Sequence, residues 1–585
     1  MSEREHLHIL NRRAFLIGSA AAAASAVLAA CGGGNATDTP KAAGGAATTA
    51  GGATTGATPP AAGPTPAPIA TSGAVPTTVS GIKNPPQGKP QGNKPSEVIL
   101  VWGTEQLLTT GTDPQTHGGT IAESKLRHIY EVLVKVERDG KTLSPALALE
   151  WKRLDDNTLQ FKLRQNVVFH NGEEFNADSV KYSVMRPLDP KNNAALRSTY
   201  STIDRVDVVD KYTVNIHTAK PDAALLLKMT GFSMVQVAPK WTEANGVGGV
   251  MKEGNGTGPY KFKSWAPQQD LVVEAFDGYW GDKPAIRNVR MKTITELATR
   301  VAAVRSGDVH VAKDMPPEEV DGMNKSGRAT ARSVASNRIP FYYMEIRKPP
   351  TNNQKIRQAI NYAVDWDSII QGILLGNGTR VSTVLAPWHV GFDPTLKPYP
   401  YDPDKAKSLL KDAGFPNGVD TNIWFIQGRY MKDREVAEAI AQQLTKVGIR
   451  CKPNLVDPVL NTQKNNAKEE DGLIFASWGN WIFDADNTLY PLFSKEVRDT
   501  ANKGQGTSSN SYYNEQFDML ITQARVELDV PKRNQLYAQA QRVLFDDAAA
   551  LFMYQLTDIY GVDNWVKFEP RFDEMMWAHD MKWNE

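Results

Sequence analysis

Residues 129–184, "IYEVLVKVERDGKTLSPALALEWKRLDDNTLQFKLRQNVVFHNGEEFNADSVKYSV", contain the pattern that decides the fold. Leu159, Phe161 and Leu163 alternate with polar residues, and an Asn-Gly turn pair follows a few residues later. A period of two places these side chains on one face of a β-strand. The stretch therefore predicts strands joined by tight turns, and most of the first half of the chain has this character.

Farther along the chain the apolar period changes to that of a helix. Residues 296–314 predict a helix capped by Gly307 and followed by a short strand. Ile356 and Ile360 lie on one face of another helix, and residues 433–456 predict an amphipathic helix that leads into a strand. Strands that alternate with helices predict an α/β body with partly parallel sheets. Such sheets bind ligands at strand ends, and two lobes bind them at their junction.

The composition of residues 96–585 is that of a globular body with more than one lobe. This part holds most of the 13 Trp, 18 Tyr and 19 Phe residues, and it is long for a single hydrophobic core. The formal net charge of the whole chain is +1, with acids and bases interspersed, which argues against a nucleic-acid-binding or membrane-binding basic face. No second long apolar run occurs, so we expect this body not to span a membrane.

The first 31 residues have the layout of an export signal. Residues 11–34 read "NRRAFLIGSAAAAASAVLAACGGG": two arginines, a mostly alanine run too weak for a membrane span, and then Cys31. The arginine pair resembles the twin-arginine export motif, and Leu-Ala-Ala-Cys resembles the lipobox of bacterial lipoproteins. We therefore expect residues 1–31 to be a lipoprotein signal peptide that ends at a lipidated Cys31. The alternative is an ordinary signal with an incidental cysteine.

Residues 32–95 consist mainly of Gly, Ala, Thr and Pro and contain no aromatic side chain. Such a segment buries too little apolar surface to offset its chain entropy, so it predicts a disordered tether. With Cys31 lipidated, Cys451 is the one remaining cysteine and can form neither an internal disulfide nor a cysteine-based zinc site. We expect no metal and no cofactor, and membrane contact through the lipid alone.

Signatures of common enzyme classes are absent from the sequence. There is no H-E-x-x-H pair, no G-x-x-x-x-G-K-[ST] loop, no G-x-S-x-G elbow and no C-x-x-C pair, and the nine histidines are scattered. A nucleophile and a base brought together only by folding would leave no such trace. We therefore expect a binding protein without catalytic residues, and a secreted hydrolase is the rival from another class.

Several motifs resemble those of solute-binding family five, the oligopeptide, dipeptide and nickel-type binding proteins of ABC importers. Residues 129–184 contain an aromatic-Glu-x-Leu-Val, a Pro-x-Leu-Ala, a Phe-x-Leu-Arg and a Val-x-Phe-His-Asn-Gly. Gly-Thr-Gly-Pro-Tyr at 256–260 and Tyr-Trp-Gly at 279–281 match as well, and matching blocks continue in order over about residues 98–565. Most of these motifs resemble scaffold, so we expect turns and packing there rather than ligand contacts.

The resemblance implies an α/β fold with the two-lobed clamshell of type II periplasmic binding proteins, in the large peptide-binder form with an extra subdomain. Lobe I would comprise residues 96–338 and 551–585, with the subdomain at about 130–280, and lobe II residues 339–550. Hinge closure would bury a ligand between the lobes, and an ABC permease with its ATPase subunits would read the closed form. The resemblance also implies an exported protein, periplasmic or at the cell surface, which we expect to be monomeric.

Peptide-binding relatives carry an aspartate three residues after a tryptophan, and this aspartate holds the α-ammonium group of the peptide. In "ASWGNWIFDADN" Trp478 matches the tryptophan, but Trp481 takes the place of the aspartate, and an indole cannot neutralise a buried ammonium. Asn480 and Asp484 belong to the same predicted site. Either Asp484 or a neighbour substitutes after a small loop shift, or the tryptophans form flat walls for a sugar ring or another hydrophobic ligand.

Four further residues are candidates for ligand contact. Trp388 could be a third wall. Glu105 lies in a Gly-Thr-Glu that matches the cleft loop of oligopeptide binders, where it would pair with a cation unless it is a solvated loop charge. Arg380 and Arg429 lie in loops that border the cleft in the family, and either could hold a carboxylate bidentately; a surface arginine is the alternative for each.

The expected ligand is a peptide or a related polar oligomer. Trp481 favours the first alternative within the class, which is an oligosaccharide or another non-peptide solute. A nickel chelate is less favoured because the sequence has no His or Cys cluster. A chaperone or signalling receptor with the same clamshell is the remaining alternative.

Overall fold

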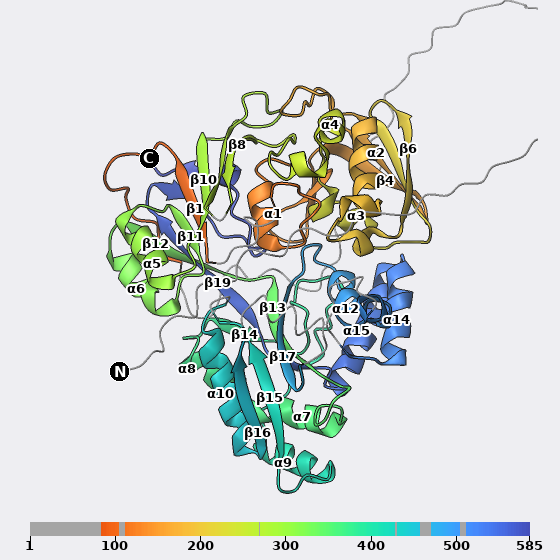
Figure 1. Ribbon diagram of the computed structural model, residues 1–585, viewed down its shortest axis with the longest axis vertical. Coiled ribbons are helices and arrows are strands. Elements are labelled where there is room, and N and C mark those ends of the chain that lie inside the picture. The colour runs from red at the N-terminus through yellow and green to blue at the C-terminus, as the bar shows by residue number, and fades with distance from the viewer. Residues whose placement is uncertain (1–83, 104–110, 268, 428–429, 457–469, 503–510) are drawn as a thin grey trace, which may run out of the picture. The chain divides into compact units, whose positions relative to one another are not determined.

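The computed structural model describes residues 84–103, 111–267, 269–427, 430–456, 470–502 and 511–585 (Figure 1). The predicted signal peptide with Cys31, residues 32–83 of the predicted tether, Glu105 and Arg429 lie outside these ranges. The described residues belong to one compact unit. No helix among them has the length and apolar character needed to cross a membrane.

The largest sheet has eight strands. Seven of them follow the order β12 (Ala329–Ala335), β19 (Tyr554–Asp563), β11 (Val311–Lys313), β1 (Val98–Trp102), β10 (Asn288–Thr293), β9 (Asp270–Ala275) and β8 (Tyr260–Ala266), and β14 (Gly378–Arg380) pairs with β19. β1 runs parallel to β10 and β11, and the other pairs are antiparallel. Helices α5 (Leu297–Ser306) and α6 (Val320–Lys325) pack on one face, and α1 (Thr120–Leu126) on the other (Figure 1).

The second large sheet has helices on both faces. Its strand order is β16 (Ile449–Leu455), β15 (Val419–Phe425), β17 (Leu473–Gly479), β13 (Arg338–Met344) and β18 (Ala550–Phe552). The face with Tyr342 packs against α7 (Gln354–Ala363), α8 (Trp366–Gly372), α9 (Pro403–Asp412) and α10 (Asp433–Lys446). The face with Phe341 packs against α12 (Asp486–Phe493), α14 (Glu515–Val526) and α15 (Val530–Asp546), and α13 (Lys495–Asn502) follows α12. Because side chains alternate along a strand, β13 serves both cores.

A four-stranded antiparallel sheet forms a third core. Its order is β4 (Ala148–Asp155), β5 (Thr158–Leu163), β7 (Thr213–Thr218) and β6 (Ile203–Asp210), with α2 (Ala177–Met185) and α3 (Leu225–Lys228) in the same core and α4 (Pro239–Val250) farther along the chain. Leu159, Phe161 and Leu163 are all buried here, as their alternation predicts. Two small sheets pair β2 (Val134–Val136) with β3 (Leu143–Pro145) and β20 (Val566–Lys567) with β21 (Lys582–Trp583).

The helices predicted in the second half are also confirmed. α5 ends at Gly307, whose φ of 85° is in the left-handed region that favours glycine at a helix end. Ile356 and Ile360 are buried on one face of α7. The segment 433–456 forms α10 followed by β16, as its change of period indicates.

Two of the passages that the chain makes between the two large sheets, from β12 to β13 and from β18 to β19, lie side by side. The backbone N–H of Ser336 donates to the carbonyl of Leu556 at 2.8 Å, and the Gln555 side chain donates to the carbonyl of Ser336 at 2.6 Å. Two adjacent connections of this kind are where hinge motion between the sheets would act. The predicted lobe boundaries, at 338/339 and 550/551, lie beside these connections and stay a prediction.

Residues 84–94, at the end of the predicted tether, lie against the eight-stranded sheet. Asn84 exchanges hydrogen bonds with the backbone of Ser333 in β12, at 2.9 and 2.7 Å. Gln87 donates to the carbonyls of Asp563 and Val566, at 3.1 and 2.6 Å. The tether prediction therefore extends too far at its C-terminal end, because a few amide side chains supply specific hydrogen bonds that composition does not reveal.

Candidate functional site

A cavity of about 250 Å³ lies at the carboxyl ends of β10, β11 and β15, beside the first half of β19. Most of its wall comes from residues within 314–316, 430–435 and 556–559. Its volume is slightly below the roughly 300–1,000 Å³ typical of small-molecule pockets. Parallel strands commonly present their carboxyl ends to ligands, so the cavity lies where the sheet type predicts a binding site.

The charged side chains at this cavity are mainly acidic. Four carboxylates line it: Asp314, Asp433, Glu435 and Asp558. Two cations line it as well, Arg300 and Lys432. Lys432 pairs with Glu318 at 2.6 Å. Arg300 donates to the backbone carbonyls of Ile294 and Asp314, at 2.6 and 2.8 Å. Lys432 also lies 3.6 Å from Glu435, so the two cations offset the four carboxylates only in part, and the cavity favours a positively charged group on a ligand.

Asp558 belongs to a cluster of four nearly buried charges. The Lys313 ammonium lies 3.0 Å from a carboxylate oxygen of Asp558 and 3.0 Å from one of Glu574. Arg338 holds Glu574 through contacts of 2.7–3.2 Å. The four side chains are between 6% and 12% exposed. Two cations face these two anions, which limits the cost of burying charge, but Asp314 adds a third carboxylate 3.1 Å from Lys313, so negative charge is in excess.

The two carboxylates of this cluster differ in their electrostatic surroundings. Burial by itself would raise the pKa of Glu574, but the charges of Arg338 and Lys313 outweigh it and lower this pKa to about 2. Burial raises the pKa of Asp558 to about 6, because Lys313 opposes it only in part and Glu574 adds repulsion. Neighbouring cations therefore compensate the negative charge of Asp558 less fully than that of Glu574.

The backbone is strained at three residues of this region. Eight non-glycine residues of the described chain have positive φ, and three of them are Asp314 (62°), Lys432 (55°) and Glu574 (66°). Asp314 and Lys432 line the cavity, and Glu574 holds the charge cluster. Such conformations cost roughly 1–3 kcal/mol each and concentrate at functional sites. Backbone strain thus points to the same location as the charges do.

Arg338 links the charge cluster to β17. Its guanidinium donates to the hydroxyls of Thr120 at 3.0 Å and Ser477 at 3.4 Å. The Tyr430 hydroxyl also hydrogen-bonds with Ser477, which fixes this cavity residue to the strand. Trp478 follows Ser477 on the opposite face of β17 and is half-buried against the core of α12, α14 and α15. The ligand role predicted for Trp478 stays a prediction.

The other two predicted tryptophans are buried. Trp481 is 7% exposed and stacks on Phe232 with ring centroids 5.1 Å apart. Trp388 is 0% exposed and lies edge-on to Phe572 at 5.9 Å. Each ring packs against an aromatic partner from a segment distant in the sequence, and ligand contact by either tryptophan stays a prediction.

Asp484, Asn480 and Arg380 have partners within the protein. Asp484 is fully buried and makes two contacts of 2.6 Å with Arg533. Asn480 is buried and donates to the Asp484 carbonyl at 2.7 Å. Arg380 pairs with Asp367 at 3.1 Å. These contacts are those of scaffold residues, and ligand contact by any of the three stays a prediction.

Asp558 and its charge cluster were not among the residues predicted from the sequence. Asp558 lies within "YQLTDIYGVD", a strand whose ten residues are all buried. Lys313 likewise ends the fully buried strand "VAK". A charge inside an apolar run is a detectable signal, because buried charges are rare unless they are paired or functional.

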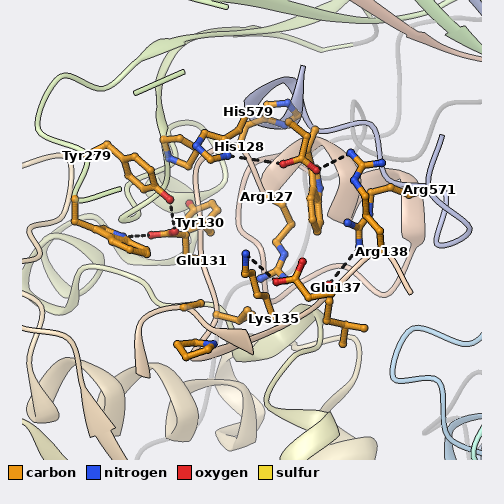
Figure 2. A pocket seen from close by; sticks show the side chains of 18 residues that line it. Arg127, His128, Tyr130, Glu131, Lys135, Glu137, Arg138, Tyr279, Arg571 and His579 are labelled. Carbon is orange, nitrogen blue, oxygen red and sulfur yellow. Dashed lines mark hydrogen bonds and ion pairs between the residues drawn. The ribbon is translucent and has the colours of Figure 1, made fainter. Parts of the chain in front are cut away.

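A second cavity, of about 420 Å³, gathers the motif residues of the scaffold (Figure 2). Glu131 accepts hydrogen bonds from the Tyr279 hydroxyl, the Trp280 indole and the Thr257 hydroxyl, each at 2.9 Å. Three motifs quoted above thus meet at one partly buried carboxylate residue. At the other end of this cavity Arg138 pairs with Asp580 at 3.0 Å. Because these polar groups are satisfied internally, we assign this cavity to the scaffold.

Comparison with sequence families and curated proteins gives consistent matches. The family model "Bacterial extracellular solute-binding proteins, family 5 Middle" matches residues 142–499. The glutathione-binding protein GsiB of Escherichia coli K12 is 27% identical over 450 residues, which cover 75% of this chain and 85% of that protein. GsiB of Pectobacterium atrosepticum is 28% identical over 451 residues, covering 76% and 86%.

Solved structures share the fold over nearly their whole length. DppA from Helicobacter pylori, in complex with the peptide STSA, has a TM-score of 0.73 at 24% identity and covers 83% of this chain and 98% of its own. NikZ from Campylobacter jejuni, in complex with Ni(L-His), has a TM-score of 0.75 at 20% identity, covering 83% and 99%. AppA from Bacillus subtilis, in complex with a nonapeptide, has a TM-score of 0.72 at 19% identity and covers 85% of this chain and 100% of its own. The predicted fold class is confirmed.

Proposed function

The chain belongs to the bacterial extracellular solute-binding proteins of family 5, and from this premise we propose that it captures a peptide outside the membrane and delivers it to an ABC permease. Its family and fold are those of binding proteins rather than enzymes. Family membership is the observation that carries the proposal. Capture requires a cavity beside a hinge, and the cavity at β19 lies next to the paired connections between the large sheets.

A ligand built from amino acids is favoured over an oligosaccharide. Glutathione, the peptide STSA and Ni(L-His), named for the relatives above, all contain amino-acid groups. The acidic lining of the cavity suits the ammonium group of such a ligand. An oligosaccharide platform needs an exposed aromatic face, whereas Trp388 and Trp481 are buried.

Ligand release from the natively purified full chain tests the proposal. Native mass spectrometry should find a retained ligand, and the released masses should be those of peptides. A chain that is isolated empty should bind glutathione or the dipeptide Met-Leu in isothermal titration, and should not bind maltotriose. Release of a sugar, or binding of maltotriose alone, would reject the peptide assignment while leaving the family assignment intact.

We also propose that the protein is exported with its twin-arginine-like signal and held at the membrane by lipid on Cys31. The order of arginines, apolar run and Leu-Ala-Ala-Cys supports this, together with the extracellular character of the family. Cys31→Ala should move the exported protein from the membrane fraction to the soluble fraction. Retention of this variant in the membrane fraction would contradict lipid anchoring, and size-exclusion chromatography with light scattering tests the expected monomer.

A further inference from the structure

A carboxylate in the cavity would suit the ammonium group of a peptide, and the family resemblance places that carboxylate at position 481, where this chain has a tryptophan. Trp481 is buried against Phe232 and cannot take over that role. We propose that Asp558, on β19, is the residue that binds the ammonium group of the ligand. This inference rests on the proposed function and adds to it the residue that sets its specificity.

The first support is a carboxylate oxygen of Asp558 that has no hydrogen-bond partner among the described residues. Its side chain is 6% exposed and lines the 250 Å³ cavity. Oδ1 pairs with Lys313 at 3.0 Å, whereas Oδ2 is buried and has no hydrogen-bond partner among the residues that the structure describes. Buried carboxylate oxygens are rarely left unsatisfied, and an ammonium offers three donors.

The neighbouring carboxylates are already engaged. Both oxygens of Asp314 have partners, Lys313 at 3.1 Å and the Gly103 N–H at 3.3 Å. Both oxygens of Glu574 are held by Arg338, and Lys313 adds a third contact. Of the carboxylates in this cluster, Asp558 is the one that combines burial with an unused oxygen.

The two acidic residues from α10 are also less suited to the role. The oxygens of Asp433 accept from the backbone N–H groups of Arg434 and Tyr430, at 2.9 and 3.3 Å. Glu435 has a side chain that is 52% exposed and lies 3.6 Å from Lys432. Water screens an exposed carboxylate, so its attraction for an ammonium is much weaker than that of a buried one.

The charge balance explains why an added cation is accepted here. Lys313 is the cation nearest to Asp558, and it is divided among three carboxylates at 3.0–3.1 Å. Arg338 is directed to Glu574. A ligand ammonium at Oδ2 would therefore balance the negative charge of Asp558, which Lys313 compensates only in part. The raised pKa of Asp558 is consistent with this deficit.

The test compares Asp558→Asn with the wild-type full chain by isothermal titration at pH 7.5. The probes are glutathione and Met-Leu, each with a free and an N-acetylated amine. Wild type should bind the free-amine probes about a hundredfold more tightly than the acetylated ones, since truncating one partner of a buried charge pair costs about that much. Asp558→Asn should lose this discrimination. Asp404→Asn, at a side chain that is 92% exposed on α9, is the matched control and should bind like wild type.

If Asp558→Asn prefers free-amine over acetylated probes as strongly as wild type does, Asp558 is not the ammonium-binding residue, and the proposal of peptide capture is unaffected. Failure of wild type to bind any free-amine probe would instead reject peptide capture, and this inference with it. Proton release on binding to wild type, measured at pH 6 in two buffers of different ionisation enthalpy, does not depend on folding of the variant. We expect protons to be released when the free-amine probes bind and not when the acetylated probes bind. Equal proton release with both would contradict the role of Asp558 in binding the ammonium group.

Discussion

The contact between Gly231 and Trp481 gives the sharpest test of the packing. Gly231 has φ −92° and ψ 177°, which alanine adopts without strain. A Cβ built there would lie 2.2 and 2.6 Å from two ring atoms of Trp481 and 3.0 Å from the Tyr200 hydroxyl. The ring cannot easily retreat, because it is 7% exposed and stacked on Phe232. Gly231→Ala should therefore force the two segments apart.

The magnitude follows from two opposing effects. Replacing glycine by alanine at a compatible backbone conformation stabilises by about 0.4–1 kcal/mol, by restricting the unfolded chain. Overpacking a buried contact costs about 1–3 kcal/mol. We expect Gly231→Ala to lower the free energy of unfolding by about 1–2 kcal/mol, as measured by urea titration followed by circular dichroism.

A double-mutant cycle separates overpacking from other causes. Trp481→Ala alone should cost about 3–5 kcal/mol as a large buried side chain. In that background Gly231→Ala should cost little, because the two ring atoms are gone and only the Tyr200 hydroxyl, at 3.0 Å, stays close. The cycle should then give a coupling energy of at least about 1 kcal/mol. Gly248→Ala, in α4 with no heavy atom within 4 Å of the added Cβ, is the matched control. Additive effects of the two substitutions would refute the contact as the cause.

Further predictions concern buried charge and the remaining thiol. Asp484→Asn should lower the free energy of unfolding by about 3–5 kcal/mol, because it leaves the buried Arg533 charge unpaired; a loss below 1 kcal/mol in urea titration would contradict this. The lowered pKa of Glu574 stabilises the fold at pH above 4.5, its ordinary pKa, and this contribution should be lost as pH falls toward 2. Glu574→Gln should show a shallower fall in unfolding free energy over that range, and equal slopes would contradict the assignment. Burial raises the pKa of Cys451 to about 12, so in the Cys31→Ala variant its thiol should react with a maleimide at pH 8 only after unfolding; fast labelling of that folded variant would show that Cys451 is accessible.

The scaffold motifs show how far local pattern reaches. Matched blocks around Glu131, Thr257 and Tyr279 predicted turns and packing, and the structure brings these residues together at one hydrogen-bonded carboxylate. The role of Glu131 as their shared acceptor could not be predicted, because hydrogen bonding across 126 and 148 positions leaves no mark on local periodicity.

Local patterns in the sequence predicted which faces of strands and helices are buried, and motif order indicated the family. The period of apolar side chains can be read from a short stretch of sequence, because it does not depend on which distant residues pack against that stretch. Only the tertiary structure decided that Trp481 packs on Phe232 and that Asp558 meets Lys313 beside a cavity. Those outcomes depend on which segments the topology brings together, and the electrostatics of a buried charge are set by neighbours distant in sequence.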